Sequence, residues 1–222
     1  MRWPVLEGVP DDDVRQLLSI ARRRTFARGE VVFHVDDPAD TLHLIVSGRF
    51  AVRVQTAVGD VVILTVLGPG EMFGELALLG DEQRRTATVQ ALQAAETRSI
   101  HRPDLARLRA AHPSVADVLV AVLAAGMRRL SRHLLEALYV PADTRVLRRL
   151  VELAATYDTG AAEVSIPLRQ EDLAAIAGTS RATVNRVLRE EEARGTVRLE
   201  RGRTTVLDRD ALERRSGCRP SQ

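Results

Sequence analysis

The sequence predicts an α+β fold in which an antiparallel β domain, one long helix and a smaller helical domain follow one another. Short apolar runs alternate with turn residues between Thr25 and Arg102, a spacing typical of a closed or sandwiched antiparallel sheet. A single apolar periodicity then runs from Pro113 to Val140. Two shorter helical patterns meet at Gly178. A chain of 222 residues is long enough to hold two separate cores.

The composition narrows the class of protein. The net charge is only +2, so no global positive field indicates nucleic acid. The one cysteine, Cys218, excludes disulfides, iron–sulfur clusters and cysteine-rich zinc sites. The five histidines have no metal-ligand spacing, and the chain has neither a nucleophile elbow nor a Gly-Lys-Ser/Thr phosphate loop, so we expect no metal and no enzyme. Without a long apolar run or a signal-peptide pattern, we expect a cytoplasmic protein with no membrane contact.

The first third of the chain is expected to begin with a helix and to continue as strands. Residues 5–24 have the pattern of a short helix, with Asp11, Asp12 and Asp13 favouring its N-terminus. Turn residues separate the apolar runs that follow. The expected strands are 31–33, 42–46, 50–54, 61–66 and 71–73.

A possible binding site follows the last of these strands. Gly74 and Glu75 lie next to it, and Arg85 and Thr86 come ten residues later, each pair flanked by apolar residues. Backbone N–H groups near Gly74 to Ala77, a guanidinium and a hydroxyl together suit a phosphate, and a carboxylate accepts hydrogen bonds from sugar hydroxyls. Spacing alone equally allows Glu75 and Arg85 to pair only with each other.

The segment from Pro113 to Val140 is predicted to be a helix roughly 40 Å long. Pro113 suits a first turn, Ser114 and Asp117 form a loose capping pair, and Pro141 marks the end. One apolar stripe contains Leu119, Leu123, Met127, Leu130, Leu134 and Leu138, and a second contains Val115, Val118, Val122 and Gly126. Two apolar faces indicate two partners, namely the helix's own domain and a second copy of the chain. The alternative is a buried core helix of a monomer.

The C-terminal third is predicted to contain a helix-turn-helix followed by a β-hairpin wing. Segments 170–177 and 181–194 are helical in pattern and are joined by Gly178-Thr179-Ser180, a turn length typical of this motif. An Arg at the start of the second helix can bind guanine O6 and N7 as a bidentate pair, and hydroxyls at the helix N-terminus suit phosphates. The candidate DNA-contacting residues are Gln170, Ser180, Arg181, Ala182, Thr183, Asn185 and Arg186, with Arg201 and Arg203 in the wing. The wing arginines are alternatively plain solvated charges.

Two of these motifs together resemble one family. Phe73-Gly74-Glu75-Leu76 and Arg85-Thr86-Ala87 resemble the phosphate-binding cassette of the CRP/FNR (catabolite activator protein) family of bacterial transcription regulators. The resemblance implies that Glu75 binds the ribose 2′-hydroxyl and that Arg85 and Thr86 bind a cyclic phosphate. It also implies a Thr-Ser pair that contacts the base, which falls on Leu130 and Ser131, with Ser131 contributed by the opposite subunit. Leu130 departs from this pattern. The implied ligand-binding set is Gly74, Glu75, Leu76, Ala77, Arg85, Thr86, Leu130 and Ser131.

The helix-turn-helix is similar to that of the same family over Ala174 to Arg186. In the family two Arg positions read guanines, and they fall here on Arg181 and Arg186. A Glu between them is replaced by Ala182, whose methyl cannot accept from cytosine N4 but can pack on a thymine methyl. The half-site preference is therefore expected to differ.

The resemblance implies a complete architecture with partners. Residues 1–112 would be a jelly-roll-like, cyclic-nucleotide-binding β-roll, 113–140 a dimerisation helix, 141–213 a winged helix-turn-helix domain and 214–222 a disordered tail. We expect a homodimer that binds palindromic double-stranded DNA and RNA polymerase, controlled allosterically by cyclic AMP, with reorientation at 139–143. The alternatives are a regulator of the same fold that responds to another ligand such as cyclic GMP, one that binds DNA constitutively with a vestigial pocket, and a protein-interaction module.

Overall fold

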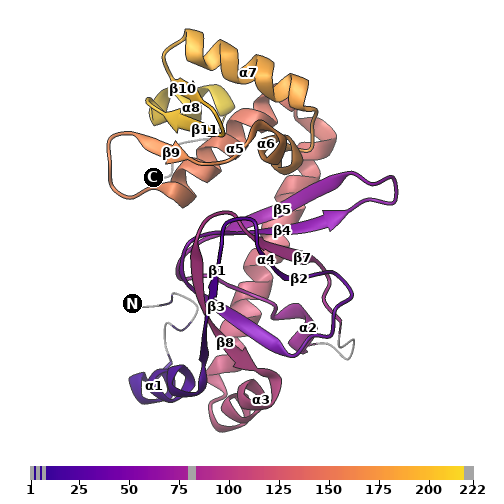
Figure 1. Ribbon diagram of the computed structural model, residues 1–222, viewed down its shortest axis with the longest axis vertical. Coiled ribbons are helices and arrows are strands. Elements are labelled where there is room, and N and C mark those ends of the chain that lie inside the picture. Colours follow the sequence, from indigo (N-terminus) through magenta and orange to yellow (C-terminus); the bar gives the residue numbers. More distant parts are fainter. Residues whose placement is uncertain (1–2, 4–5, 7–8, 80–83, 218–222) are drawn as a thin grey trace. The chain divides into compact units, whose positions relative to one another are not determined.

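The computed structural model describes residues 3, 6, 9–79 and 84–217, and Cys218 lies outside them. The chain divides into two compact units (Figure 1). The first contains residues 1–54 and 64–129, and the second contains residues 55–63 and 130–222. Each mixes helices with antiparallel sheets, which confirms the α+β class.

The first unit is built around two four-stranded antiparallel sheets, with strand orders β1-β8-β3-β6 and β2-β7-β4-β5. Apolar side chains from both sheets form one core, which includes Phe26, Ile45, Phe50, Phe73 and Val89. The elements of this part of the chain are α1 (Asp11–Ile20), β1 (Arg22–Phe26), β2 (Val31–Phe33), β3 (Thr41–Ser47), β4 (Phe50–Gln55), β5 (Val61–Leu67), β6 (Met72–Phe73), α2 (Leu76–Leu79), β7 (Thr88–Ala91), β8 (Ala95–His101), α3 (Arg102–Ala111) and α4 (Ser114–Tyr139). The expected β-roll is therefore present.

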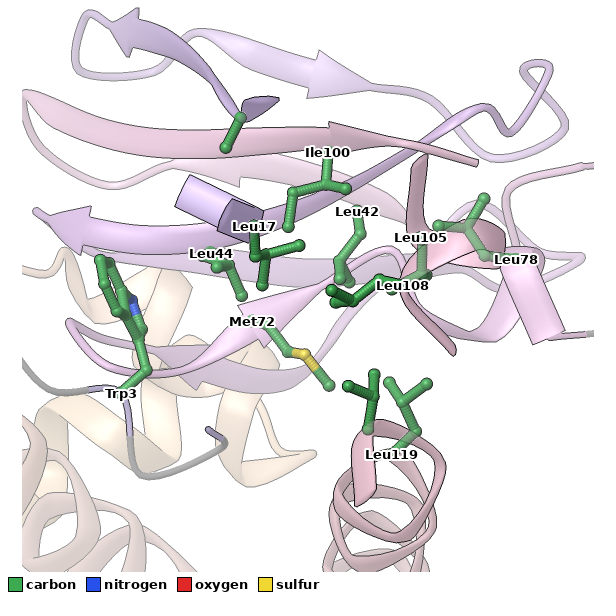
Figure 2. Close-up of a cluster of buried hydrophobic side chains, with 12 residues drawn as sticks. Trp3, Leu17, Leu42, Leu44, Met72, Leu78, Ile100, Leu105, Leu108 and Leu119 are labelled. Carbon is green, nitrogen blue, oxygen red and sulfur yellow. The ribbon is translucent and has the colours of Figure 1, made fainter. Parts of the chain in front are cut away.

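A second core joins one of these sheets to the helices. Successive side chains of a strand point to opposite faces, so Leu42 and Leu44 of β3 face away from the core that holds Ile45. They pack with Leu17 of α1, Leu105 and Leu108 of α3, and Val115 and Leu119 of α4. Figure 2 shows Leu42, Leu44, Leu108 and Met72 gathered in this core, with Leu119 at the end of a helix.

Two elements of the first unit differ from the expectation. Residues 22–24, which we expected to end the first helix, belong instead to β1, which pairs with β8 from Arg22↔Ser99 to Phe26↔Ala95. The helical pattern ends because Leu17 is the one buried residue of α1 and nothing apolar continues its face into Arg22-Arg23-Arg24. Helix α3 was not predicted, because its buried Leu105 and Leu108 form too short a pattern to identify it.

Helix α4 contains the predicted apolar stripes, but its buried and exposed apolar residues are separated along its length rather than between the two stripes. Near the N-terminus Val115 and Leu119 are buried in the helix's own domain, with Val122 packed beside them. Four further members of the first stripe are between 57% and 66% exposed, namely Met127, Leu130, Leu134 and Leu138. A continuous apolar stripe with this exposure is inconsistent with a core helix of a monomer.

The second unit contains the predicted helix-turn-helix and wing. Its elements are α5 (Ala142–Tyr157), β9 (Val164–Ile166), α6 (Gln170–Ala177), α7 (Arg181–Ala193), β10 (Val197–Glu200), β11 (Arg203–Val206) and α8 (Arg209–Ser216). Gly178 ends α6 in the left-handed region at φ 60°, which favours glycine. Helices α6 and α7 share a core of Leu173, Ala174, Ala177, Val184, Val187 and Leu188, all buried as predicted.

The predicted start of the disordered tail, at residue 214, is wrong. Residues 214–216 belong to α8, where Ser216 is fully buried and its carbonyl accepts a hydrogen bond from Arg148 Nε at 3.0 Å. Asp208 caps the helix by accepting from the N–H of Ala211, and Leu212 anchors it. Within the described part of the chain, no single helix is long and apolar enough to cross a membrane, and α3 and α4 pass that test only as a pair bent by 116°.

Candidate functional sites

Arg85 is held inside the first unit by the start of β3. Its Nη1 donates to the carbonyl oxygen of Thr41 at 2.8 Å, its Nη2 donates to Thr41 Oγ1 at 2.9 Å, and its guanidinium lies 3.9 Å from the ring centroid of Phe33. Gly74 has φ 90°, and a Cβ added there would lie 2.7 Å from Arg85 Nη1. Gly74 is therefore required both by its left-handed backbone and by the close approach of Arg85.

The charge of Arg85 is incompletely compensated. Only 3% of the residue is exposed, and its Nε has no hydrogen-bond partner among the described residues. The nearest carboxylate is that of Asp40, at 3.7 Å from Nη2. Burial lowers the pKa of Arg85, and the charges of Asp40 and Asp37 oppose that shift. A buried cation with an unused donor is suited to an anionic ligand.

Glu75 lies beside Arg85 without pairing with it. No ion pair between these two residues occurs in the described structure, and Arg85 binds Thr41 instead. Burial raises the pKa of the Glu75 carboxyl, while a backbone hydrogen bond and the charge of Arg129 act in the opposite direction. The alternative in which Glu75 and Arg85 serve only each other is therefore wrong. The carboxylate remains available to accept from a ligand hydroxyl.

The other residues of the predicted ligand-binding set differ in exposure and in the unit to which they belong. Thr86 follows Arg85 and is exposed, and Leu76 begins α2 with its side chain 52% exposed. Ala77 lies in α2, and residues 80–83 lie outside the described residues. Leu130 and Ser131 are exposed on α4 but belong to the second unit. The structure thus brings Gly74, Glu75 and Arg85 together, while the base-contact pair stays a prediction.

Sequence reasoning missed His43, which is linked to Arg85 through Thr41. The ring stacks on Phe73 with centroids 4.9 Å apart and planes at 7°. Its Nδ1 lies 3.0 Å from Thr97 Oγ1, and its Nε2 lies 3.3 Å from the Thr41 hydroxyl that accepts from Arg85. Burial, assisted by the charge of Arg85, lowers the pKa of His43 to about 3, so the ring is neutral. One signal for His43 was present in the sequence, namely that the alternation of side chains along β3 places it on the inward face.

The second candidate site is the outward face of α7. Ser180 caps the helix by accepting from the N–H of Thr183 at 3.1 Å, and its Oγ lies 3.0 Å from Thr183 Oγ1. Val184, Val187 and Leu188 face the core, whereas Arg181, Ala182, Asn185 and Arg186 are exposed. This leaves four of the predicted DNA-contacting side chains on the open face of the helix.

Two of these side chains have partners on other helices that the sequence did not reveal. Arg186 forms ion pairs with Asp143 at the start of α5 and with Glu190 at 2.9 Å. The hydrogen bond to Asp143 and that to Glu190 raise the pKa of Arg186. Asn185 Nδ2 donates to Gln170 Oε1 at 3.0 Å. Arg181 forms no ion pair with any described residue.

The wing is fixed to α7 by acidic residues. Glu191 is 1% exposed, accepts from Thr196 Oγ1 at 2.7 Å just before β10, and forms an ion pair with Arg215 of α8 at 2.9 Å. Glu192 accepts from the N–H of Leu199 in β10 at 3.1 Å. At the other end of the hairpin, Arg201 and Arg203 are exposed, which fits both phosphate contact and plain solvated charges.

Comparisons with known proteins match both halves of the chain. Residues 23–112 match the cyclic nucleotide-binding domain model, and residues 144–215 match the Crp-like helix-turn-helix domain model. The CRP-like cAMP-activated global transcriptional regulator of Mycobacterium tuberculosis is 32% identical over 218 residues, covering 97% of both chains.

Solved structures give the same result. The catabolite activator protein of Thermus thermophilus is 33% identical, with a TM-score of 0.56 over 97% of this chain and 100% of that one. The c-di-GMP-responsive regulator CLP of Xanthomonas campestris, 20% identical, shares the fold with a TM-score of 0.76 over 89% of this chain and 99% of that one. With both domain models matched in order and a relative aligned over nearly its full length, the chain belongs to the CRP/FNR family of transcription regulators.

Proposed function

We propose that this chain is a homodimeric transcription regulator whose sequence-specific DNA binding is controlled by cyclic AMP. As a family member with both domains, it is a ligand-responsive DNA-binding regulator. The identity of the ligand is the step beyond that statement, and the M. tuberculosis relative, which is cAMP-activated by name, supports it. Because the relatives are transcription regulators, we also propose that the chain is not an enzyme and that it acts with RNA polymerase.

The observation that carries the proposal is the buried guanidinium of Arg85 beside Gly74 and Glu75. Its Nε has no partner among the described residues, and Thr86 follows with an exposed hydroxyl. These donors suit a cyclic phosphate, and Glu75 suits the ribose hydroxyl. No metal is needed, because the cation that neutralises the phosphate is Arg85.

The exposed stripe on α4 supports the homodimer. In a two-fold dimer each stripe would pack on its counterpart, so that 113–140 serves as the dimerisation helix between a sensor (1–112) and a DNA-binding domain (141–213). A two-fold protein binds a palindromic site with half-sites one DNA turn apart. Ligand would favour the arrangement with that spacing.

The test is calorimetric titration of the full chain with cyclic AMP and, separately, cyclic GMP. We expect cyclic AMP to bind at roughly micromolar affinity or better, about one per chain. Glu75→Gln and Thr86→Val should weaken binding, whereas Thr25→Val, a matched change at an exposed threonine of β1, should not. Silence with cyclic AMP, or equal loss in all three variants, would contradict the proposal.

A further inference from the structure

The open face of α7 contains one amide side chain, that of the predicted DNA-contacting residue Asn185, to which no base is yet assigned. Asn185 lies four residues after Arg181, so the two side chains occupy the same face of the helix one turn apart. Both are exposed. In helix-turn-helix proteins the N-terminal residues of the second helix contact base edges in the major groove. Asn185 therefore occupies a position from which a side chain reaches a base.

The amide of Asn185 is held in one orientation by the neighbouring helix. Its Nδ2 donates to Oε1 of Gln170, the first residue of α6, at 3.0 Å. An asparagine amide has two N–H donors and one acceptor oxygen. The bond to Gln170 uses one donor, and within the described structure the side chain makes no other hydrogen bond. One N–H and the oxygen Oδ1 are left for another partner.

This remaining pair matches one base. Adenine presents an N7 acceptor next to an N6 donor in the major groove, and asparagine binds these two atoms as a bidentate pair. Guanine presents two acceptors there and cytosine a donor alone, so neither matches a donor beside an acceptor. The arrangement also compensates for Ala182, whose methyl cannot accept a hydrogen bond from a base.

We propose that Asn185, oriented by Gln170, reads an adenine in each half-site of the DNA. Oδ1 accepts from adenine N6, and Nδ2 donates to N7 while it continues to donate to Gln170. Gln170 acts through Asn185 and is a positioning residue. This assignment rests on the proposed sequence-specific DNA binding and adds to it the base that one side chain recognises.

The test is selection of bound sequences from a DNA library with randomised half-sites, using the full chain with and without cyclic AMP. We expect adenine at one position of each half-site, preferred roughly 5- to 150-fold over the other bases. In Asn185→Ala this preference should disappear while the preferences at other positions remain. An unchanged set of base preferences in Asn185→Ala would overturn the assignment.

Two further variants distinguish recognition from a structural contact between α6 and α7. Asn185→Asp has acceptors only, so it should exchange the adenine preference for cytosine, whose N4 is a donor. Gln170→Glu also only accepts, so it should keep the adenine preference even though its added negative charge weakens binding to all DNA. Loss of the adenine preference in Gln170→Glu would contradict the proposed orientation of Asn185.

Failure of this inference is distinguishable from failure of the proposed function. Sequence-specific binding by the wild type together with an unaltered profile in Asn185→Ala overturns the role of Asn185 alone. If the wild type selects no sequence from the library under either condition, both the role of Asn185 and the sequence-specific regulator are wrong.

Discussion

Arg85 shows how a ligand-binding residue also contributes to the fold. From its motif alone, Arg85→Ala is expected to abolish nucleotide binding and leave the fold intact. The hydrogen bonds from its guanidinium to both oxygens of Thr41, and its contact with Phe33, indicate a second effect. Removing the guanidinium leaves the partly buried carbonyl of Thr41 without that donor, and such a loss costs about 1–3 kcal/mol.

We therefore predict that Arg85→Ala loses nucleotide affinity and is also less stable than the wild type by about 1–3 kcal/mol. Thr86→Val is the control, because Thr86 is exposed and its substitution should change stability by less than about 0.5 kcal/mol while still weakening nucleotide binding. Urea unfolding without nucleotide, combined with calorimetric titration, separates the two effects. Equal stability of Arg85→Ala and the wild type would contradict a structural role for Arg85.

His43 gives a prediction about pH. Its pKa is about 3 in the folded chain, against an ordinary value of 6.5. Between these values the unfolded chain binds a proton that the folded chain does not, so the stability is complete above about pH 6.5 and falls as the pH decreases toward 3. From pH 7 to pH 5, this loss amounts to roughly 2 kcal/mol.

His43→Gln removes this titration while keeping a side chain that can hydrogen-bond to Thr41 and Thr97. We predict that the free energy of unfolding of the variant depends less steeply on pH than that of the wild type between pH 7 and pH 5. Urea unfolding at a series of pH values measures both slopes. Parallel curves would mean that His43 accepts a proton in the folded chain.

At the residue scale, the sequence identified the residues of the phosphate-binding cassette but not the residues that hold their side chains in place. Gly74, Glu75, Arg85 and Thr86 were found because their types and spacing fit a phosphate and a sugar. Thr41 is 44 positions from Arg85, and Asp143 is 43 positions from Arg186, so no local pattern connects them. Such partners are set by how strands and helices pack, which one sequence does not specify residue by residue.

At the scale of elements, long periodic segments were predicted well and short ones were not. Helix α4 runs from Ser114 to Tyr139, close to the segment proposed from its apolar stripes. Helices α3 and α8 were not predicted, because each depends on one or two buried leucines and on contacts with distant segments. Periodicity identifies an element only when enough turns repeat the same face.

The exposed stripe of α4 gives a prediction at the scale of elements, on oligomeric state. Leu134 is 59% exposed in the middle of that stripe, so Leu134→Glu should place a charge in the dimer interface and shift the protein toward monomer. Ala125→Glu, an exposed position of α4 on a different face, is the matched control and should stay dimeric. Sedimentation equilibrium measures both. A dimer of unchanged strength in Leu134→Glu would exclude this stripe as the interface.

DNA recognition by α7 gives a second prediction at the scale of elements. In the free chain the carboxylate of Asp143 is bound to Arg186, and an exposed pair of this kind is weak and screened by salt. We predict that Asp143→Asn tightens binding to the selected DNA site by a few-fold, on the order expected for losing one exposed ion pair, and that the gain shrinks at high salt.

Asp158→Asn is the control for the change in net charge, because Asp158 pairs with Arg209 of α8 rather than with a residue of α7. Fluorescence anisotropy with labelled DNA at two salt concentrations measures both variants. If the two variants tighten binding equally, the effect comes from net charge alone and Asp143 does not compete for Arg186.

At the scale of the whole molecule, the sequence predicted two domains but not the boundary between the two compact units. The compact units separate between Arg129 and Leu130 within α4, rather than at 139–143. Glu136 of α4 explains this, because its buried carboxylate forms ion pairs with Arg148, at 2.9 Å, and with Arg149, both of α5. These pairs connect the end of α4 to the DNA-binding domain across the segment where we expected reorientation.

In the proposed mechanism, nucleotide bound at Arg85 in one unit controls DNA binding by α7 in the other. The most direct measurement is the dissociation constant of the full chain for its selected DNA site, with and without saturating cyclic AMP, by fluorescence anisotropy. Coupling between two sites of a protein is typically about 5- to 150-fold, and we predict that cyclic AMP tightens DNA binding within that range. Equal affinity in both conditions, while calorimetry shows that cyclic AMP binds, would contradict the account.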